Sequence, residues 1–209
     1  MMKIKIVGLT GQTGAGKSSV SRIISSRRIE VIDCDEVSRY VVDNEKSCVA
    51  DLSLEFGIQI LDVNGSLNRK KLGSIVFGDK EKLSKLNLLI LPYICDEVFK
   101  RVKRLDEKNV PLVVLDAPTL FESGIEKSCD FVVSVIAPLQ LRLNRIIVRD
   151  HLTDDEARRR IASQHEDEFY TGRSDYVIVN DGDLHDLHLK TLEMINLMLS
   201  KLTPEEDCV

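Results

Sequence analysis

Signals for membrane insertion or secretion are missing from this sequence. No apolar run approaches the roughly 18 consecutive residues that a membrane-spanning helix needs. Strand-like sequence begins directly after the first residues, so we expect no signal peptide. The five cysteines are odd in number and never form a C-x-x-C pair, which disfavours a disulfide framework or a zinc site. We therefore predict a cytoplasmic protein with reduced thiols.

The sequence also lacks an excess of positive charge. Its formal net charge is −5, and of its 209 residues 43% are hydrophobic and 30% are charged. These values are ordinary for a globular protein and disfavour a general nucleic-acid binder, so we expect neither nucleic acid nor membrane as a partner. Lysine is absent between Ser128 and Leu189, yet seven arginines lie between Arg142 and Arg173.

A glycine-rich segment is the strongest motif. Gly11-Gln-Thr-Gly-Ala-Gly-Lys-Ser18 follows the apolar run Ile4–Leu9 and matches G-x-x-x-x-G-K-[ST], the phosphate-binding loop. Apolar residues at helical spacing follow it, so the loop joins a strand to a helix, where backbone N–H groups can surround a polyanion. Lys17 would reach the β- and γ-phosphates of a nucleotide and Ser18 would ligate Mg²⁺. The alternative is a glycine turn that binds nothing. The predicted nucleotide-binding residues of the loop are Gly11, Gly14, Ala15, Gly16, Lys17, Ser18 and Ser19.

Four further apolar runs predict buried parallel strands, with helical patterns between them. They are Glu30–Asp33, Leu112–Leu115, Phe131–Ile136 and Tyr176–Val179. This alternation predicts an α/β fold with a parallel five-stranded sheet flanked by helices. The segment from Asp183 to Leu202 should be the last helix, packing on the sheet through Leu192, Ile195, Leu199 and Leu202. We expect the acidic tail Thr203–Val209 to be frayed.

The sequence predicts one unit with two insertions: a core of residues 1–35, 108–140 and 174–203, a helical insertion at 36–107, and a lid at 141–173. Within the helical insertion, Asn64-Gly65 suits a tight hairpin turn. Asn68 is expected to cap a helix that runs through Phe77, and Asp79 to cap the next one. Leu91-Pro92 should end that helix, and another should follow. The helical insertion is the natural place for the second substrate.

Carboxylates follow two of the predicted strands, where open α/β sheets bind ligands. If the second strand continues through Asp35, then Asp33 and Asp35 face the same side. Asp35 is the predicted base that accepts the proton of an acceptor hydroxyl, with Asp33 in reserve. The alternative is that Asp35 only caps a helix beginning near Glu36. Asp116 ends another strand and is either a Mg²⁺ ligand or an ordinary polar residue at a strand end.

Arginines dominate the predicted lid. Pro138 should begin a helix that carries Arg142, Arg145 and Arg149 on one face, where they would repel one another unless an anion such as phosphate lies against them. Thr153-Asp-Asp-Glu156 predicts a capping box that begins a second short helix, carrying Arg158–Arg160. A lid that closes over a triphosphate would supply positive charge and exclude water; a solvated basic surface is the alternative. His185-x-x-His188 fits a solvated helix face better than a metal pair.

The missing guanine-recognition motif N-K-x-D disfavours a GTPase, which leaves a small-molecule kinase. At this point the chain resembles the dephospho-CoA kinase family over nearly its whole length. The matching segments are Gly8–Ser18, Val31–Asp35 with Arg39, Gly65–Leu72 running to Val76-Phe77, Asp116–Glu122, Gln140–Arg145, Arg149-Asp150, Arg160–Gln164 and Asp175–Gly182.

The resemblance implies that the γ-phosphoryl group of ATP is transferred to the 3′-hydroxyl of dephospho-CoA, the last step of coenzyme A synthesis. It implies that Asp35 is the base, that Lys17, Arg145 and Arg149 meet the phosphates, and that Asn180 and Gly182 border the adenine of ATP. The acceptor residues that it implies are Asp33, Arg39, Arg69, Pro118, Leu120, Phe121 and Glu122. The implied cofactors are ATP and Mg²⁺, in a monomer or weak homo-oligomer.

The sequence departs from the family pattern at five positions, which are Asn68, Leu91, Thr119, Tyr170 and Thr171. We assign no role to Leu91 and expect no typical basic lid contact from Tyr170 or Thr171. Two rival functions remain at this stage: a nucleoside or nucleotide kinase, and an ATP-dependent regulatory protein without an acceptor.

Overall fold

The computed structural model describes residues 3–76 and 78–202 of the chain. Phe77, the expected end of a helix, and the tail 203–209, expected to be frayed, lie outside these residues. The described residues form two compact units, the phosphate-loop unit within residues 1–32 and 105–209 and the helical unit within residues 33–104.

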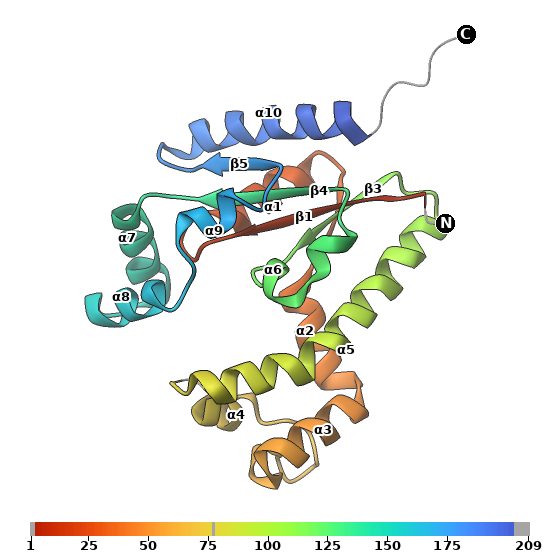
Figure 1. Cartoon of the computed structure of the whole chain (residues 1–209), viewed down its shortest axis with the longest axis vertical. Helices are drawn as coiled ribbons and strands as arrows, with labels where there is room; N and C mark the ends of the chain where they lie inside the picture. Colours follow the sequence, from red (N-terminus) through yellow and green to blue (C-terminus); the bar gives the residue numbers. More distant parts are fainter. Residues whose placement is uncertain (1–2, 77, 203–209) are drawn as a thin grey trace. The chain divides into compact units, whose positions relative to one another are not determined.

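A five-stranded sheet forms the centre of the phosphate-loop unit (Figure 1). The strands are β1 (Lys5–Gly11), β2 (Glu30–Asp33), β3 (Leu112–Asp116), β4 (Phe131–Ile136) and β5 (Tyr176–Val179). Their order is β2-β3-β1-β4-β5, and β1 pairs in parallel with both β3 and β4. Every residue of β3 and β4 is buried, because parallel strands are covered on both faces. The predicted parallel α/β sheet is confirmed.

Helices α1 (Lys17–Ser26) and α10 (Leu184–Leu202) pack against each other beside the sheet (Figure 1). Their apolar sides join the strands in one core through Val20 and Ile24 of α1 and Met194 and Met198 of α10. The predicted contact face of the last helix is confirmed, since Ile195 is buried and the three leucines at 192, 199 and 202 pack against the core. This packing fixes the start of α1, directly after the phosphate loop.

Shorter helices complete the phosphate-loop unit. They are α6 (Leu120–Ser123), the 3₁₀ turn η2 (Ile125–Ser128), α7 (Leu139–Asp150), α8 (Asp154–Ala162) and α9 (Asp167–Thr171). Helix α7 begins directly after Pro138, as predicted. The predicted capping box of α8 is confirmed, since Thr153 and Glu156 each accept a backbone N–H of the other. Leu143 and Ile146 of α7 pack on Ala157 of α8, so these two helices form one body.

The helical unit consists of α2 (Cys34–Asn44), α3 (Lys46–Phe56), the turn η1 (Ile58–Ile60), α4 (Arg69–Val76) and most of α5 (Lys80–Glu107). Both predicted caps are confirmed. Asn68 accepts the N–H of Lys71 at 2.9 Å, and Asp79 accepts those of Glu81 and Lys82, each at 3.1 Å. The predicted turn at Asn64-Gly65 is confirmed as well: it closes a single antiparallel bridge between residues 61 and 67.

The predicted helix end at Leu91-Pro92 is wrong. Helix α5 is continuous from Lys80 to Glu107 with Pro92 inside it, and it bends part-way along (Figure 1). A proline removes one helical hydrogen bond and costs about 3 kcal/mol. Val98 and Val102 are fully buried on the following turns, and this burial offsets the cost. Among the described residues, no helix is both long and apolar enough to cross a membrane.

Candidate active site

The phosphate loop connects β1 to α1. Strand β1 continues through Gly11, two residues beyond the predicted end at Leu9. Gly16 caps α1 in a left-handed conformation with φ +105°, which costs a residue with a Cβ about 1–2 kcal/mol. Ala15 is completely buried beneath the loop. Lys17 and Ser18 therefore begin the helix, with the Ser18 side chain exposed.

Three consecutive carbonyl groups of the loop accept hydrogen bonds from side chains outside it. Arg142 Nε donates to the oxygen of Thr13 at 3.1 Å, Arg145 Nη1 donates to that of Gly14 at 3.3 Å, and Asn180 Nδ2 donates to that of Ala15 at 2.6 Å. In a trans peptide the N–H points opposite to the carbonyl. The N–H groups of Gly14 and Gly16 therefore face away from these side chains, as an anion site requires.

Lys17 and Asp116 form an ion pair at the carboxyl ends of neighbouring strands. Asp116 is the last residue of β3, lies opposite Leu9 of β1 and is 7% exposed. The side chain of Lys17 is 15% exposed, so the pair is largely shielded from solvent and interacts more strongly than a surface pair. Asp116 thus holds the lysine of the loop near the place where phosphates would bind.

The expected strand geometry of Asp33 and Asp35 is wrong. Strand β2 ends at Asp33 and helix α2 begins at Cys34. Asp33 is the helix cap: its Oδ1 accepts the N–H of Asp35 at 2.8 Å and that of Glu36 at 3.1 Å. The alternative that Asp35 is the cap is therefore also wrong. Asp35 lies in the first turn of α2 with an exposed side chain.

The three arginines of α7 do not form the single anion-facing stripe that their spacing predicts. Arg142 is 4% exposed and binds the phosphate loop and Gln164. Arg145 contacts the loop and Asn180, at 3.3 to 3.5 Å. Arg149 instead pairs with Asp150 at 2.7 Å. Arg142 and Arg145 are thus bonded to neutral oxygens and only Arg149 has a carboxylate partner, so the three guanidinium groups point to different partners.

Neighbouring carboxylates also neutralise part of the predicted second helix of the lid. Arg158 pairs with Asp154 and Arg160 pairs with Asp150. The guanidinium groups of Arg149 and Arg160 lower the pKa of Asp150 to about 2. These pairs are partly exposed, so each contributes little to stability.

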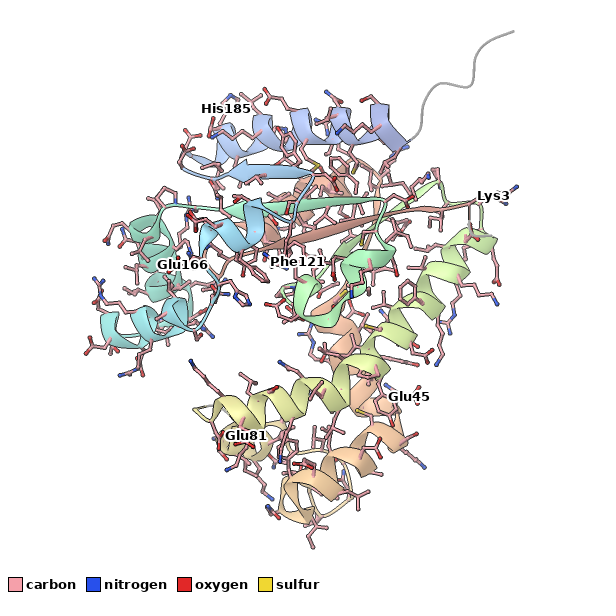
Figure 2. All side chains as sticks on the ribbon, viewed as in Figure 1. Lys3, Glu45, Glu81, Phe121, Glu166 and His185 are labelled. Carbon is pink, nitrogen blue, oxygen red and sulfur yellow. The ribbon has the colours of Figure 1, made fainter. Side chains whose placement is uncertain are left out.

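The segment after β3 supports an aromatic cluster. Leu120 is fully buried against Gly8, and the Pro118 carbonyl accepts the hydroxyl of Thr10 at 3.3 Å. Phe121 meets Phe169 edge-on at 5.5 Å between ring centroids, and Figure 2 shows Phe121 beside the helix that follows Glu166. Buried Tyr170 joins this cluster, which explains why a basic residue is not needed there.

A cavity of about 510 Å³ lies beside the aromatic cluster. It is lined by Phe121, Glu122, Glu126, His165, Phe169 and Arg173. His165 stacks on Phe169 with ring centroids 3.7 Å apart, and its Nε2 lies 3.5 Å from Glu122. Aromatic walls with carboxylates at the rim suit a planar heterocycle that carries hydrogen-bond donors.

The two predicted acceptor-binding arginines of the helical unit lie together. Arg69 donates to the carbonyl oxygen of Arg39 at 3.1 Å and to the carboxylate of Asp43 at 2.7 Å. Both arginines border a cavity of about 260 Å³ with mostly apolar walls, which include Val42 and Leu72. A pocket with apolar walls and a basic rim suits a ligand that carries both an apolar chain and phosphate.

Three further expectations concern the end of the chain and metals. The side chain of Asn180 is buried and engaged with the loop, whereas Gly182 is exposed close to Asp186. His185 is exposed on α10 (Figure 2), and among the described residues no group of three or more histidines, cysteines or acids forms a metal site. His188, the second residue of the pair, is half-buried.

Sequence reasoning missed the role of two glutamines. Gln164 accepts the N–H of Thr13 at 2.9 Å, and Gln12 donates to Asp167 at 2.8 Å. No local signal in one sequence reveals such contacts, because the partners are more than 150 positions apart.

The match to known families decides the class. Residues 5–186 match the family model described as dephospho-CoA kinase. The chain belongs to the dephospho-CoA kinase family. It is therefore a kinase that depends on ATP, takes dephospho-CoA as substrate and performs the final step of coenzyme A biosynthesis. This family membership replaces the two rival functions, a nucleoside or nucleotide kinase and a regulatory protein without an acceptor, as the assignment for this chain.

Similar proteins span nearly the same length. The chain is 40% identical to a dephospho-CoA kinase of Fusobacterium nucleatum over 90% of this chain and 96% of the relative. It is 35% identical to that of Corynebacterium glutamicum over 94% and 98%. The solved dephospho-CoA kinase of Campylobacter jejuni superposes with a TM-score of 0.68 at 27% identity, covering 92% and 96% of the two chains. A shikimate kinase from Acinetobacter baumannii, with a TM-score of 0.53 at 15% identity, shares the fold alone.

Proposed function

We propose that the phosphate loop of this family member binds the triphosphate of ATP through the N–H groups of Gly14, Gly16, Lys17 and Ser18 and the ammonium group of Lys17. The observation that carries this assignment is the outward bonding of three loop carbonyls to Arg142, Arg145 and Asn180. Donors that are already oriented bind an anion without first reordering the loop. Gly11 serves by permitting the tight approach of the loop to β4, where a Cβ would lie 2.3 Å from the oxygen of Val135.

We propose Ser18 and Asp116 as the residues that hold Mg²⁺. Oxygen donors are the ligands this ion prefers, and one or two protein ligands plus phosphate oxygens are typical of kinase sites. The hydroxyl at the start of α1 and the carboxylate at the end of β3 supply that donor set. When bound, the ion neutralises charge on the phosphates. Asp116 also pairs with Lys17, so this carboxylate would interact with two cations, the Lys17 ammonium group and Mg²⁺.

Asp35 is the proposed base that accepts the proton of the 3′-hydroxyl. It follows the end of β2 by two residues, and ligands of parallel α/β sheets bind outside the carboxyl ends of strands. Arg145 is the proposed group that stabilises charge on the transferred phosphoryl, since it lies against the loop carbonyl of Gly14. Arg149 would join it only after leaving Asp150. Asn180 acts by positioning the loop, and Gly182 borders the adenine of ATP.

We propose dephospho-CoA-binding residues in each of the two units, taken separately. In the phosphate-loop unit the contacts come from Phe121 and Glu122, which line the aromatic cavity, while Pro118 and Leu120 support that segment from below. In the helical unit they come from Arg39 and Arg69, with Asp33 fixing the start of α2. A cytoplasmic location and a monomer or weak homo-oligomer remain our proposals.

Release of ADP with a panel of acceptors tests this function. We expect turnover with dephospho-CoA and none with uridine or nucleoside monophosphates, and the opposite pattern would refute the acceptor. Lys17→Ala should weaken ATP binding and reduce turnover together, because the lysine contacts the phosphates in both the ground state and the transition state. Lys71→Ala serves as a control, since this lysine bonds to a backbone carbonyl of the helical unit. Unchanged turnover of Lys17→Ala would contradict the phosphate-loop assignment.

A further inference from the structure

Thr13 of the phosphate loop has both of its backbone polar groups bonded to side chains from much later in the chain. Its N–H donates to Oε1 of Gln164 at 2.9 Å, and its carbonyl accepts Nε of Arg142 at 3.1 Å. Arg142 Nη2 also donates to the same oxygen of Gln164 at 3.1 Å. The three residues therefore form a closed ring of three hydrogen bonds.

Burial makes this ring more than a surface contact. Arg142 is 4% exposed, and a buried guanidinium is costly unless its donors are satisfied. Burial lowers the pKa of Arg142, while the nearby carboxylate of Asp167 opposes that shift. A hydrogen-bonded network in such surroundings favours one geometry, because breaking its bonds leaves buried polar groups unpaired.

A second tie joins the same two segments. Gln12 is 2% exposed, and its Nε2 donates to Asp167 at 2.8 Å and to the carbonyl of His165 at 3.4 Å. The connection between α8 and α9, residues 163–166, and the first residue of α9 are thus bonded to two consecutive residues of the phosphate loop. These are positions that the motif G-x-x-x-x-G-K-[ST] leaves open.

We propose that Gln164 and Arg142 are positioning residues that clamp the backbone N–H and carbonyl of Thr13 and so hold the phosphate loop in its ATP-binding conformation. This inference rests on the proposed ATP site. The amide oxygen of Gln164 is the essential atom, because it accepts two of the three N–H donors of the ring. Without it, the N–H of Thr13 loses its partner, and Arg142 loses a bond that positions it against the Thr13 carbonyl. The N–H of Gly14 lies in the same peptide group as that carbonyl, so it loses its fixed direction. The effect should fall on ATP and ADP affinity and spare the acceptor.

The test compares two substitutions at Gln164 that differ in the acceptor atom. Gln164→Met keeps the length of the side chain but removes the oxygen, and we expect the KM for ATP and the Kd for ADP to rise about tenfold. Gln164→Glu keeps an oxygen that accepts both bonds, so both constants should stay within about threefold of the parent. The KM for dephospho-CoA should change less than twofold in either variant. Gln140→Met is the matched control, because Gln140 is exposed and its side chain donates along α7 to Asn144.

A purely structural role gives a different pattern. It would lower the melting temperature of both variants or of the Met variant alone, with no selective change in the ATP constants. KM does not depend on the fraction of folded enzyme, so a partly unfolded preparation still reports the effect. If Gln164→Met fails to fold, Gln164→Ala is measured in the same way with the same expectation.

Three outcomes would overturn the clamp: normal ATP constants in the Met variant, equal losses in the Met and Glu variants, or an equal rise in both substrates' KM. Failure of the ATP site itself is distinguishable. Active Lys17→Ala would refute the site, whereas inactive Lys17→Ala combined with a normal Met variant refutes the clamp alone.

Discussion

Asn180 donates a hydrogen bond from its side-chain amide to the carbonyl oxygen of Ala15 at 2.6 Å, joining positions 165 residues apart. The bond is buried and lies where β5 ends and α1 begins. It leaves no room beside the next residue, because a Cβ added to Gly16 would lie 2.3 Å from the Asn180 amide nitrogen. The glycine of the motif is thus required by a packed side chain as well as by its backbone angle.

Gly16→Ala should therefore impair ATP binding more than stability. The new methyl group displaces Asn180 and frees the carbonyl of Ala15, so we expect the KM for ATP to rise at least tenfold. Gly124→Ala is the control: it has φ +73° and no atom within 4 Å of its Cβ position. That variant should lose about 1–2 kcal/mol of stability with an unchanged KM. Steady-state kinetics and urea unfolding distinguish the two, and equal KM values would contradict the steric argument.

The sequence predicts the sheet well because its evidence is local. Each strand of the sheet is a short run rich in Val and Ile, and three of them begin and end where predicted: β2, β4 and β5. The phosphate loop is equally readable, since its glycines and lysine are adjacent in the chain. Both kinds of signal arise within about ten residues, so one sequence contains them completely.

The wrong predictions concern features that depend on contacts between distant residues or on the exact residue at which a helix begins. Pro92 is tolerated because burial on the following turns outweighs a lost hydrogen bond. Asp33 rather than Asp35 caps α2 because the helix begins at Cys34, directly after the strand. Arg142 is an internal ligand of the loop, and its partner Thr13 lies 129 positions away. Helical spacing identifies the face of an arginine but not the group that it meets.

Thiol reactivity should differ sharply among the cysteines. Burial, aided by nearby acidic groups, raises the pKa of Cys48 to about 11 and that of Cys129 to about 12. The thiolate is the reactive form of cysteine, and at pH 8 both groups carry little of it. We expect iodoacetamide to modify half-buried Cys34 well before either of them, and denaturant to remove the difference. Peptide mass spectrometry over time measures this order. Labelling of Cys129 at the rate of Cys34 would contradict it.

Acid should weaken the junction between α7 and α8. The pKa of Asp150 is about 2 in the folded chain and roughly 3.9 when unfolded. Its stabilising contribution is therefore complete above about pH 4 and declines as the pH falls toward 2. Asp150→Asn should lower the free energy of unfolding at pH 6 by no more than about 1 kcal/mol, since the pair is partly exposed.

Urea unfolding of the parent and Asp150→Asn at several pH values measures this contribution. The difference between them should shrink steadily below pH 4. Asp155→Asn, an exposed acidic residue in the first turn of α8, is the control and should show a smaller difference. A gap between parent and Asp150→Asn that stays constant down to pH 2 would mean that ion pairing is not its source.

The two aspartates at the start of α2 should separate catalysis from stability. Asp35→Asn removes the proposed base, so kcat should fall at least a hundredfold, the scale of general-base catalysis, with the KM for ATP within twofold. Asp33→Ala removes the helix cap and should cost about 1 kcal/mol of unfolding free energy, while Asp33→Asn retains an oxygen for both N–H groups and should restore most of it. Initial rates and thermal melting of the three variants decide the matter. A catalytic loss in Asp33→Asn as large as that in Asp35→Asn would move the base to Asp33.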